Sequence, residues 1–183
     1  MQETGTEWRA GMILMPAHDF ETVKAVYIDV IAHTPEIEKH ARWEYGKHPS
    51  DELLRLYMEN DEMYFLMDGE RTAGAVAVVM HQEQDYHEIA WAQSLSDDEV
   101  ATIHLLAVVP DYRGRSLGKR ILEEAAALAA ENGKKAIRLD VLKSNLPAQH
   151  MYQSAGFSFR GTQYLFAENT AWTDFLYYEK TLS

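Results

Sequence analysis

Two apolar runs, Thr102–Val109 and Ala136–Leu142, enclose a segment with the features of a helix. Pro110 ends the first run, and the helical segment Leu117–Asn132 closes at Gly133, a residue type that is common just beyond helix ends. A long helix between two strands favours a parallel crossover, because antiparallel neighbours can be joined by a much shorter turn. This order of elements predicts an α/β protein.

A second pattern adds antiparallel strands to the same sheet. Met63–Met67 and Ala73–Met80 flank the turn residues Asp68-Gly69, which predicts a β-hairpin. The sheet should therefore be mixed. The other elements that we expect are a strand at Gly11–Ala17, a helix from the cap Asp19 to about Pro35, a helical region Glu36–Asn60 that restarts at the cap Ser50, a short helix within Asn145–Gly156, and two strands after Ser158.

Composition limits the classes of protein that need considering. At 183 residues, 46% of them hydrophobic, the chain can form one domain over residues 1–183 with a sizeable core. It has no cysteine, which excludes a disulfide framework and a cysteine nucleophile. The formal net charge of −12 disfavours binding to nucleic acid or to an anionic membrane. No apolar run is long enough to span a membrane, so we expect a cytoplasmic protein.

The turn before the long helix is strongly basic. From Arg113 to Arg120 it holds four positive charges and no negative one, in a chain whose net charge is −12. The exposed amides and the dipole of a helix N-terminus favour an anion, and the two glycines of the turn allow close backbone approach. These features predict a phosphate or pyrophosphate site, with an ordinary solvated turn as the alternative. The phosphate-binding patterns of P-loop ATPases and of Rossmann dehydrogenases are both absent.

Two motifs resemble those of the GCN5-related N-acetyltransferase (GNAT) superfamily. The first resembles its acetyl-CoA motif, Q/R-x-x-G-x-G/A, at Arg113, Ser116 and Gly118. The second resembles the pattern N-x-x-A-x-x-x-Y-x-x-x-G-F, matched by Asn145, Ala148, Tyr152, Gly156 and Phe157. The resemblance covers residues 102–157, the expected acetyl-CoA-binding core. It implies a mixed central sheet with flanking helices, in which two splayed parallel strands form the acetyl-CoA cleft.

The resemblance also implies how acetyl-CoA is bound. The pantetheine arm would pair with the backbone near Ala107–Val109 as an additional strand, and the pyrophosphate would rest on the amides of residues 114–119. The residues assigned to this site are Ala107, Val108, Val109, Arg113, Gly114, Arg115, Ser116, Leu117, Gly118, Lys119 and Asn145. Ser116 replaces the middle glycine of the motif. Serine is accepted at helix N-termini and keeps its amide proton, so we expect the site to be retained; a positive φ at Ser116 would count against this.

Catalytic roles follow from the chemistry of amine acetylation. Attack on a thioester needs a neutral amine and a proton for the departing thiolate. The resemblance implies that Tyr152 donates this proton, although a packing role against Phe157 is the alternative. His104, within the first apolar run, is a candidate base, either directly or through water. It could instead face the other side of the sheet and be only hydrogen-bonded. Glu99 and water alone are further candidates for the base.

These observations lead to two main functional hypotheses, beside a third in which the chain is a structural or interaction domain with a vestigial site. The first is an acetyl-CoA-dependent N-acetyltransferase that moves the acetyl group directly to a primary amine, on a small molecule or a protein α-amine, in a ternary complex. The second is a non-catalytic acyl-CoA-binding sensor. Residues 81–99 contain acidic residues and no Lys or Arg, and are expected to form a strand extension followed by an exposed loop that could attract a cationic amine. No metal is expected, and a homodimer is a further expectation.

Overall fold

The structure, a computed structural model, describes residues 11–183. Within this range the strands form one mixed sheet in the order β1-β2-β3-β4-β5-β7-β6. Only the β4–β5 pair is parallel among the strand pairs described. The bounds of the strands are β1 Ile13–Pro16, β2 Met63–Asp68, β3 Arg71–Val79, β4 Val100–Val108, β5 Ala136–Leu142, β6 Ser158–Ala167 and β7 Ala171–Thr181.

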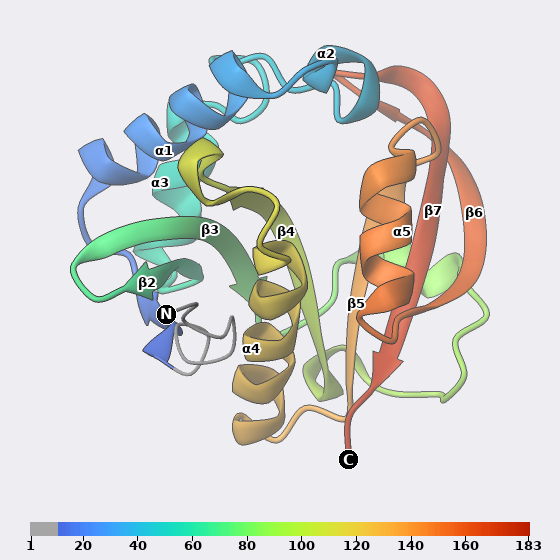
Figure 1. Ribbon diagram of the computed structural model, residues 1–183. Coiled ribbons are helices and arrows are strands. Elements are labelled where there is room, and N and C mark those ends of the chain that lie inside the picture. The colour runs from blue at the N-terminus through green and yellow to red at the C-terminus, as the bar shows by residue number, and fades with distance from the viewer. Residues whose placement is uncertain (1–10) are drawn as a thin grey trace.

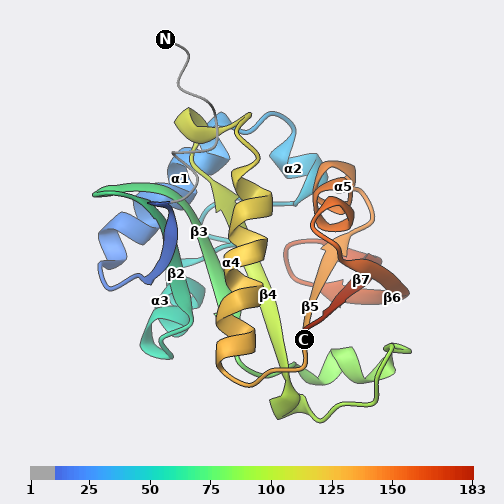
Figure 2. The same ribbon diagram turned by 60° about the horizontal axis from the view of Figure 1, so that its bottom comes forward.

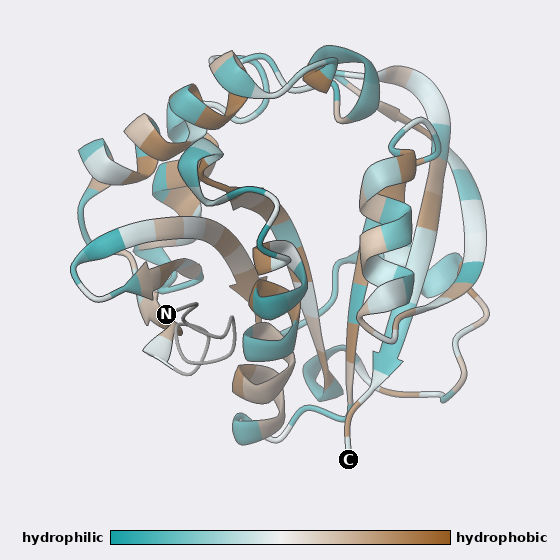
Figure 3. Ribbon diagram, viewed as in Figure 1, coloured by the Kyte–Doolittle hydropathy of each residue, from teal (hydrophilic) through white to brown (hydrophobic). Residues whose placement is uncertain are grey.

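Helices cover both faces of the sheet (Figures 1 and 2). The α-helices are α1 Phe20–His33, α2 Ile37–His40, α3 Asp51–Glu59, α4 Leu117–Glu131 and α5 Leu146–Ser154, and short 3₁₀ turns are η2 Gln84–Glu88, η3 Asp97–Glu99 and η4 Pro110–Tyr112. Helices α4 and α5 pack on one face, with Ile121 and Leu122 of α4 fully buried. Helices α1 and α3 pack on the other, where Tyr27 and Leu54 are fully buried. Hydrophobic residues run along β3, β4 and β5 between these layers (Figure 3).

The expected helix starts at Asp19 and Ser50 are confirmed. The Asp19 carboxylate accepts a hydrogen bond from the Thr22 amide at 2.9 Å, and the Ser50 hydroxyl accepts one from the Leu53 amide at 3.2 Å. Each cap satisfies an amide that the first turn of its helix leaves without a carbonyl partner. Because both caps are local contacts, the sequence alone was enough to predict them.

The two parallel strands pair only at their first residues. Val100–Thr102 pair with Ala136–Arg138, and beyond these positions no β4–β5 pairing is described. A bulge in β4 accompanies the separation: β3 residues Ala75 and Ala77 pair with Ala107 and His104, so β4 has one extra residue there. Leu105, within the bulge, has φ of 53°. Figure 1 shows β4 and β5 diverging toward α2, as the splayed arrangement requires.

The expectation for residues 81–99 is wrong in part. Strand β3 ends at Val79, so there is no strand extension, and the segment forms the turns η2 and η3. Tyr86 is 1% exposed. Its aromatic ring packs with Ile89 and Tyr177 in a small separate core beside β7. The buried Arg138 of β5 also holds this segment, since its guanidinium lies 4.0 Å from the centre of the Trp91 ring. The buried residues Gln82, Tyr86 and Ile89 therefore anchor the segment to the rest of the protein, while most of its other side chains are exposed, as expected.

Candidate active site

A cavity of about 820 Å³ opens where β4 and β5 diverge. One wall is the continuous run Ile103–Val108 of β4, and the opposite wall combines Asp140–Leu142 of β5 with residues of α5. The end of α1, α2, the loop before α3 and the turn between β6 and β7 also contribute to the lining. Because β4 has no β5 partner beyond Thr102, backbone groups on this edge are available to an extended ligand.

The basic turn lies at one end of this cavity. Of the residues predicted to bind acetyl-CoA, five line the cavity: Ala107, Val108, Arg113, Gly114 and Asn145. The other six are not part of the lining: Val109, Arg115, Ser116, Leu117, Gly118 and Lys119. Most of these lie at the N-terminus of α4, and among the described residues no backbone N–H from 114 to 119 has a carbonyl partner; the next bonded amide is that of Arg120, at 3.2 Å from Ser116 O. These free amides are the part of the turn that can receive an anion.

Ser116 does not have the conformation expected of a serine at a helix N-terminus. Its φ is 58°, in the left-handed region, and its side chain makes no capping hydrogen bond to α4. This is the condition that the sequence argument counted against the serine. The left-handed geometry explains why related motifs use glycine here, since glycine adopts positive φ without a steric penalty. The amide of Ser116 nonetheless remains without a carbonyl partner among the described residues.

Several predicted binding side chains have structural partners instead. The Arg113 guanidinium donates to the carbonyl of His33 at 2.5 Å and to the Thr34 hydroxyl, so it ties the turn to the end of α1. The Asn145 side chain caps α5 by accepting from the Ala148 amide at 3.3 Å. Arg113 and Asn145 thus shape the cavity through these contacts, which engage part of the hydrogen-bonding capacity of each side chain.

Tyr152 of α5 lines the cavity with its ring packed against Phe157 and Tyr178, the ring centres being 6.2 Å apart in each case. The expected packing against Phe157 is therefore present. Burial, together with the charge of Asp140, raises the pKa of the Tyr152 hydroxyl, so the phenol keeps its proton at neutral pH. Packing fixes the ring and burial keeps the proton, and both are compatible with a proton donor.

His104 faces the cavity, not the opposite side of the sheet. Its Nε2 lies 2.9 Å from Oε1 of Glu83, and the side chain is 20% exposed. Burial disfavours the imidazolium, but the hydrogen bond and the charge of Glu83 outweigh it, so the pKa of His104 is raised. Burial alone would raise the pKa of Glu83. The hydrogen bond and the charge of His104 have a larger effect, so the pKa of Glu83 is lowered. When His104 is protonated the two residues form an ion pair, in which each favours the charged form of the other.

Glu99, another candidate base, lies elsewhere. It is not part of the cavity lining; it pairs with Lys135 and closes a capping box with Ser96 at the start of β4. Tyr57 and Asp140 do line the cavity near His104, and the sequence argument missed both. No motif marks them, because Tyr57 is on a helix and Asp140 is within an apolar strand. For Tyr57, the only signal in the sequence was that it is an aromatic residue on the amphipathic helix α3.

Trp43 lines the cavity, whereas Trp91 packs against the small core of Tyr86. Within residues 11–183 there is no cluster of three or more histidine, aspartate or glutamate side chains arranged to hold a metal ion. Over the same residues, no helix has the length and apolar character needed to cross a bilayer.

The fold and the cavity define a family. The family model described as "Acetyltransferase (GNAT) family" matches residues 29–157, which is more than half of the chain. The chain therefore belongs to the GNAT acetyltransferase family.

Individual relatives match over shorter segments. Streptothricin acetyltransferase of Streptomyces lavendulae is 35% identical over 82 residues, which is 45% of this chain and 40% of that protein. This and three other relatives match the chain over 30% to 44% of their own lengths.

Solved structures share the whole fold. A GNAT acetyltransferase of Streptococcus agalactiae has a TM-score of 0.75 at 18% identity, with 94% of this chain and 96% of that chain covered. A Bacillus subtilis acetyltransferase, solved in complex with CoA, has a TM-score of 0.62 at 15% identity, covering 94% of this chain and 100% of that one. At these identities the likeness concerns the fold alone.

Proposed function

We propose that this chain is an acetyl-CoA-dependent N-acetyltransferase that transfers the acetyl group directly to a primary amine, on a small molecule or a protein α-amine, within a ternary complex. The observation that carries the proposal is the cavity between the diverging strands β4 and β5, with Tyr152 and His104 both in its lining. Membership of the GNAT family and the CoA complex of the Bacillus subtilis relative support it. A reaction that uses acetyl-CoA is consistent with a cytoplasmic protein.

The proposed acetyl-CoA site has two parts, the free edge of β4 and the basic turn before α4. The pantetheine arm pairs with the free edge of β4 near Ala107 and Val108, and the pyrophosphate lies on the unpartnered amides of residues 114–119. Binding through the backbone tolerates many side chains, so the engaged side chains of Arg113 and Asn145 do not prevent it. Ser116 contributes its amide while holding the left-handed backbone that the turn requires.

In the proposed reaction the amine nitrogen attacks the thioester carbonyl, a C–N bond forms and the C–S bond breaks. His104 removes a proton from the amine, directly or through water, and Tyr152 protonates the departing sulfur. The two groups line the same cavity from β4 and α5, so one ligand can reach both. With no cysteine in the chain, a cysteinyl acetyl-enzyme cannot form, which favours direct transfer.

Replacing Tyr152 by phenylalanine tests the proposal. The substitution removes the hydroxyl while keeping the ring that packs on Phe157 and Tyr178, so folding should be retained. If the hydroxyl supplies the proton, amine-dependent release of free CoA thiol should fall by about 10²–10³-fold, while the Kd of acetyl-CoA should stay nearly constant. Tyr164→Phe, which removes the hydroxyl of an exposed tyrosine outside the cavity, is the matched control.

The experiment also separates the two hypotheses. A chain that binds acetyl-CoA but releases no thiol with any amine would be an acyl-CoA-binding sensor. Turnover that survives Tyr152→Phe unchanged would show that the proton comes from another group, and the role of Tyr152 would then be packing alone.

A further inference from the structure

His104 has close polar contacts besides its place in the cavity lining. Strand β4 carries His104 with its Nε2 atom 2.9 Å from Oε1 of Glu83 and 3.2 Å from Oγ1 of Thr102. Glu83 lies 21 positions earlier in the chain, and it reaches β4 because the segment after β3 folds back along the sheet. The other carboxylate oxygen of Glu83, Oε2, is buried without a hydrogen-bond partner in the described chain.

These contacts fix which ring nitrogen carries the hydrogen. The Thr102 hydroxyl donates its proton to the carbonyl of His81 at 3.1 Å, so toward His104 it presents a lone pair. The Glu83 carboxylate is also an acceptor. Both neighbours of Nε2 therefore accept, and Nε2 must be the donor whether the ring is neutral or charged. In the neutral ring the second nitrogen, Nδ1, is then unprotonated, and it has no hydrogen-bond partner among the described residues.

The ring is also held in orientation. The Tyr57 ring of α3 stacks on the imidazole with an interplanar angle of 17° and ring centres 6.1 Å apart. The charged and titratable groups within electrostatic reach of the imidazole are Glu83 and Asp85 from the segment after β3, Asp140 from β5, Glu62 before β2, and His48 from the loop before α3. With its Nε2 engaged and one face covered, His104 presents Nδ1 to a ligand in the cavity.

We propose that Glu83, assisted by Thr102, is a positioning residue that holds His104 in its Nε2–H form and so makes Nδ1 the atom that accepts the proton of the amine. The inference rests on the proposed acetyltransferase function. When the amine attacks, its proton passes to Nδ1, the ring becomes an imidazolium, and the Glu83 carboxylate stabilises the new charge. The proton then leaves to solvent. Glu83 does not touch the substrate; it acts through His104.

The charge of Glu83 has a predictable effect on pH dependence. The carboxylate favours the imidazolium and makes His104 a stronger base, in accord with its raised pKa. His104 must be neutral to accept a proton, so activity should rise with pH through the pKa of His104. Glu83→Gln keeps an oxygen acceptor for Nε2 and removes the negative charge, so it should shift this acid limb to lower pH.

Two measurements on the full chain test the proposal. In the first, the histidine ring nitrogens are labelled with ¹⁵N and the tautomer and titration of His104 are followed by NMR over about pH 5–9. We expect the wild type to show the Nε2–H form, and Glu83→Gln to lower the His104 midpoint by about one pH unit or more. Glu88→Gln, at an exposed glutamate in the same segment, should change neither.

In the second measurement, the pH profile of kcat/KM is recorded for the same variants. Glu83→Gln should shift the acid limb to lower pH and reduce the plateau, because a less basic imidazole is a weaker proton acceptor. His104→Gln should abolish the limb. A purely structural role for Glu83 would lower the thermal midpoint or the plateau and leave the limb in place.

The two readouts keep this proposal separate from the proposed function. An unchanged His104 midpoint in Glu83→Gln, or an Nδ1–H tautomer in the wild type, would overturn the positioning role, and neither result depends on knowing the acceptor. Failure of the acetyltransferase function would instead appear as an absence of amine-dependent thiol release by a wild-type chain that binds acetyl-CoA. That result would mean that Glu83 has no role in catalysis, even if the NMR titration of His104 behaved as expected.

Discussion

Ser116 holds a backbone conformation that costs an L-residue energy. Its φ of 58° is left-handed, and its hydroxyl makes no capping bond to α4. A left-handed conformation costs roughly 1–2 kcal/mol for a residue with a Cβ atom, whereas the extra freedom of glycine in the unfolded chain costs about 0.4–1 kcal/mol. We therefore predict that Ser116→Gly stabilises the protein by about 0.5–1 kcal/mol, measured by urea denaturation, and leaves acetyl-CoA affinity intact.

Ser116→Ala is the matched control for this prediction. Alanine has the same backbone strain as serine and only removes the hydroxyl, so stability should change by less than about 0.5 kcal/mol. Loss of a true serine cap would instead cost about 1 kcal/mol. A destabilised Ser116→Ala together with an unimproved Ser116→Gly would mean that the hydroxyl caps α4 in solution and that the backbone is not strained.

At the scale of single residues, the sequence predicted what a motif or a local contact encodes. Tyr152 was found because its spacing from Asn145 and Phe157 follows a pattern, and the caps Asp19 and Ser50 were found because a cap bonds only three positions along the chain. Glu83 was not found as the partner of His104. Their contact joins residues 21 positions apart and exists only once the segment after β3 has folded against the sheet.

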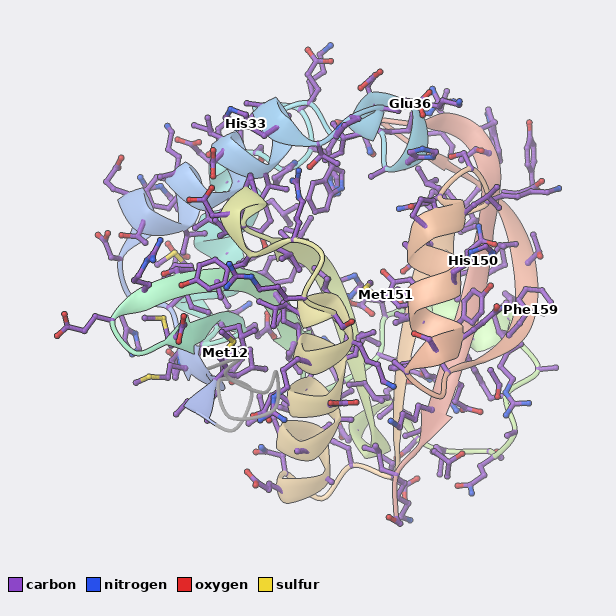
Figure 4. The ribbon with its side chains drawn as sticks, viewed as in Figure 1. Met12, His33, Glu36, His150, Met151 and Phe159 are labelled. Atoms are coloured by element: carbon purple, nitrogen blue, oxygen red, sulfur yellow. The ribbon has the colours of Figure 1, made fainter. Side chains whose placement is uncertain are left out.

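Gly118 of α4 lies against the Met151 side chain of α5. A Cβ atom built at Gly118 would lie 2.2 Å from the Met151 sulfur, so the flexible Met151 side chain would have to move. Figure 4 shows Met151 on the side of α5 that faces α4, with His150 turned away. The glycine of the sequence motif therefore has a packing role between two helices in addition to any role at the phosphate site.

We predict that Gly118→Ala forces the Met151 side chain to move and destabilises the protein by at most about 1 kcal/mol, because the flexible thioether can shift toward the cavity that it lines. In a Met151→Ala background the same change should be neutral or stabilising by up to about 1 kcal/mol, since alanine is a better helix residue than glycine. A double-mutant cycle in urea measures this coupling. Equal effects of Gly118→Ala in both backgrounds would rule out Met151 as the reason for the glycine.

At the scale of elements, most regular segments agreed with expectation, whereas residues 41–45, expected to be helical, and residues 81–99 did not. The hairpin β2–β3, the strands β4 and β5 and the helix α4 lie within two residues of the predicted bounds, because each has a simple apolar pattern between clear turn residues. Residues 81–99 were expected to be largely an exposed loop. Their acidic composition gave no sign that Tyr86 is buried, with its hydroxyl donating to the partly buried Asp140 at 2.7 Å.

The whole molecule is organised around the separation of β4 and β5. The bulge at Leu105 and the single short stretch of parallel pairing create an open edge inside a continuous sheet. Helices α1 and α3 close one face and α4 and α5 the other, so a ligand along this edge would contact both cores. We propose that the described chain folds as one cooperative domain, since the sheet runs unbroken from β1 to β6.

Ligand binding at the open edge should therefore stabilise the whole domain at once. With acetyl-CoA at about 100 times its Kd, linkage predicts about 2.7 kcal/mol of added stability. For a domain of this size that corresponds to a rise of about 5–11 °C in the thermal midpoint, in a single transition seen equally by fluorescence and circular dichroism. Pantetheine lacks the pyrophosphate that would lie on the amides of residues 114–119, so it should produce a much smaller rise at the same concentration. An equal rise with pantetheine would contradict an anion site at the start of α4. No rise with acetyl-CoA at millimolar concentration would contradict the proposed function and would not affect the description of the fold.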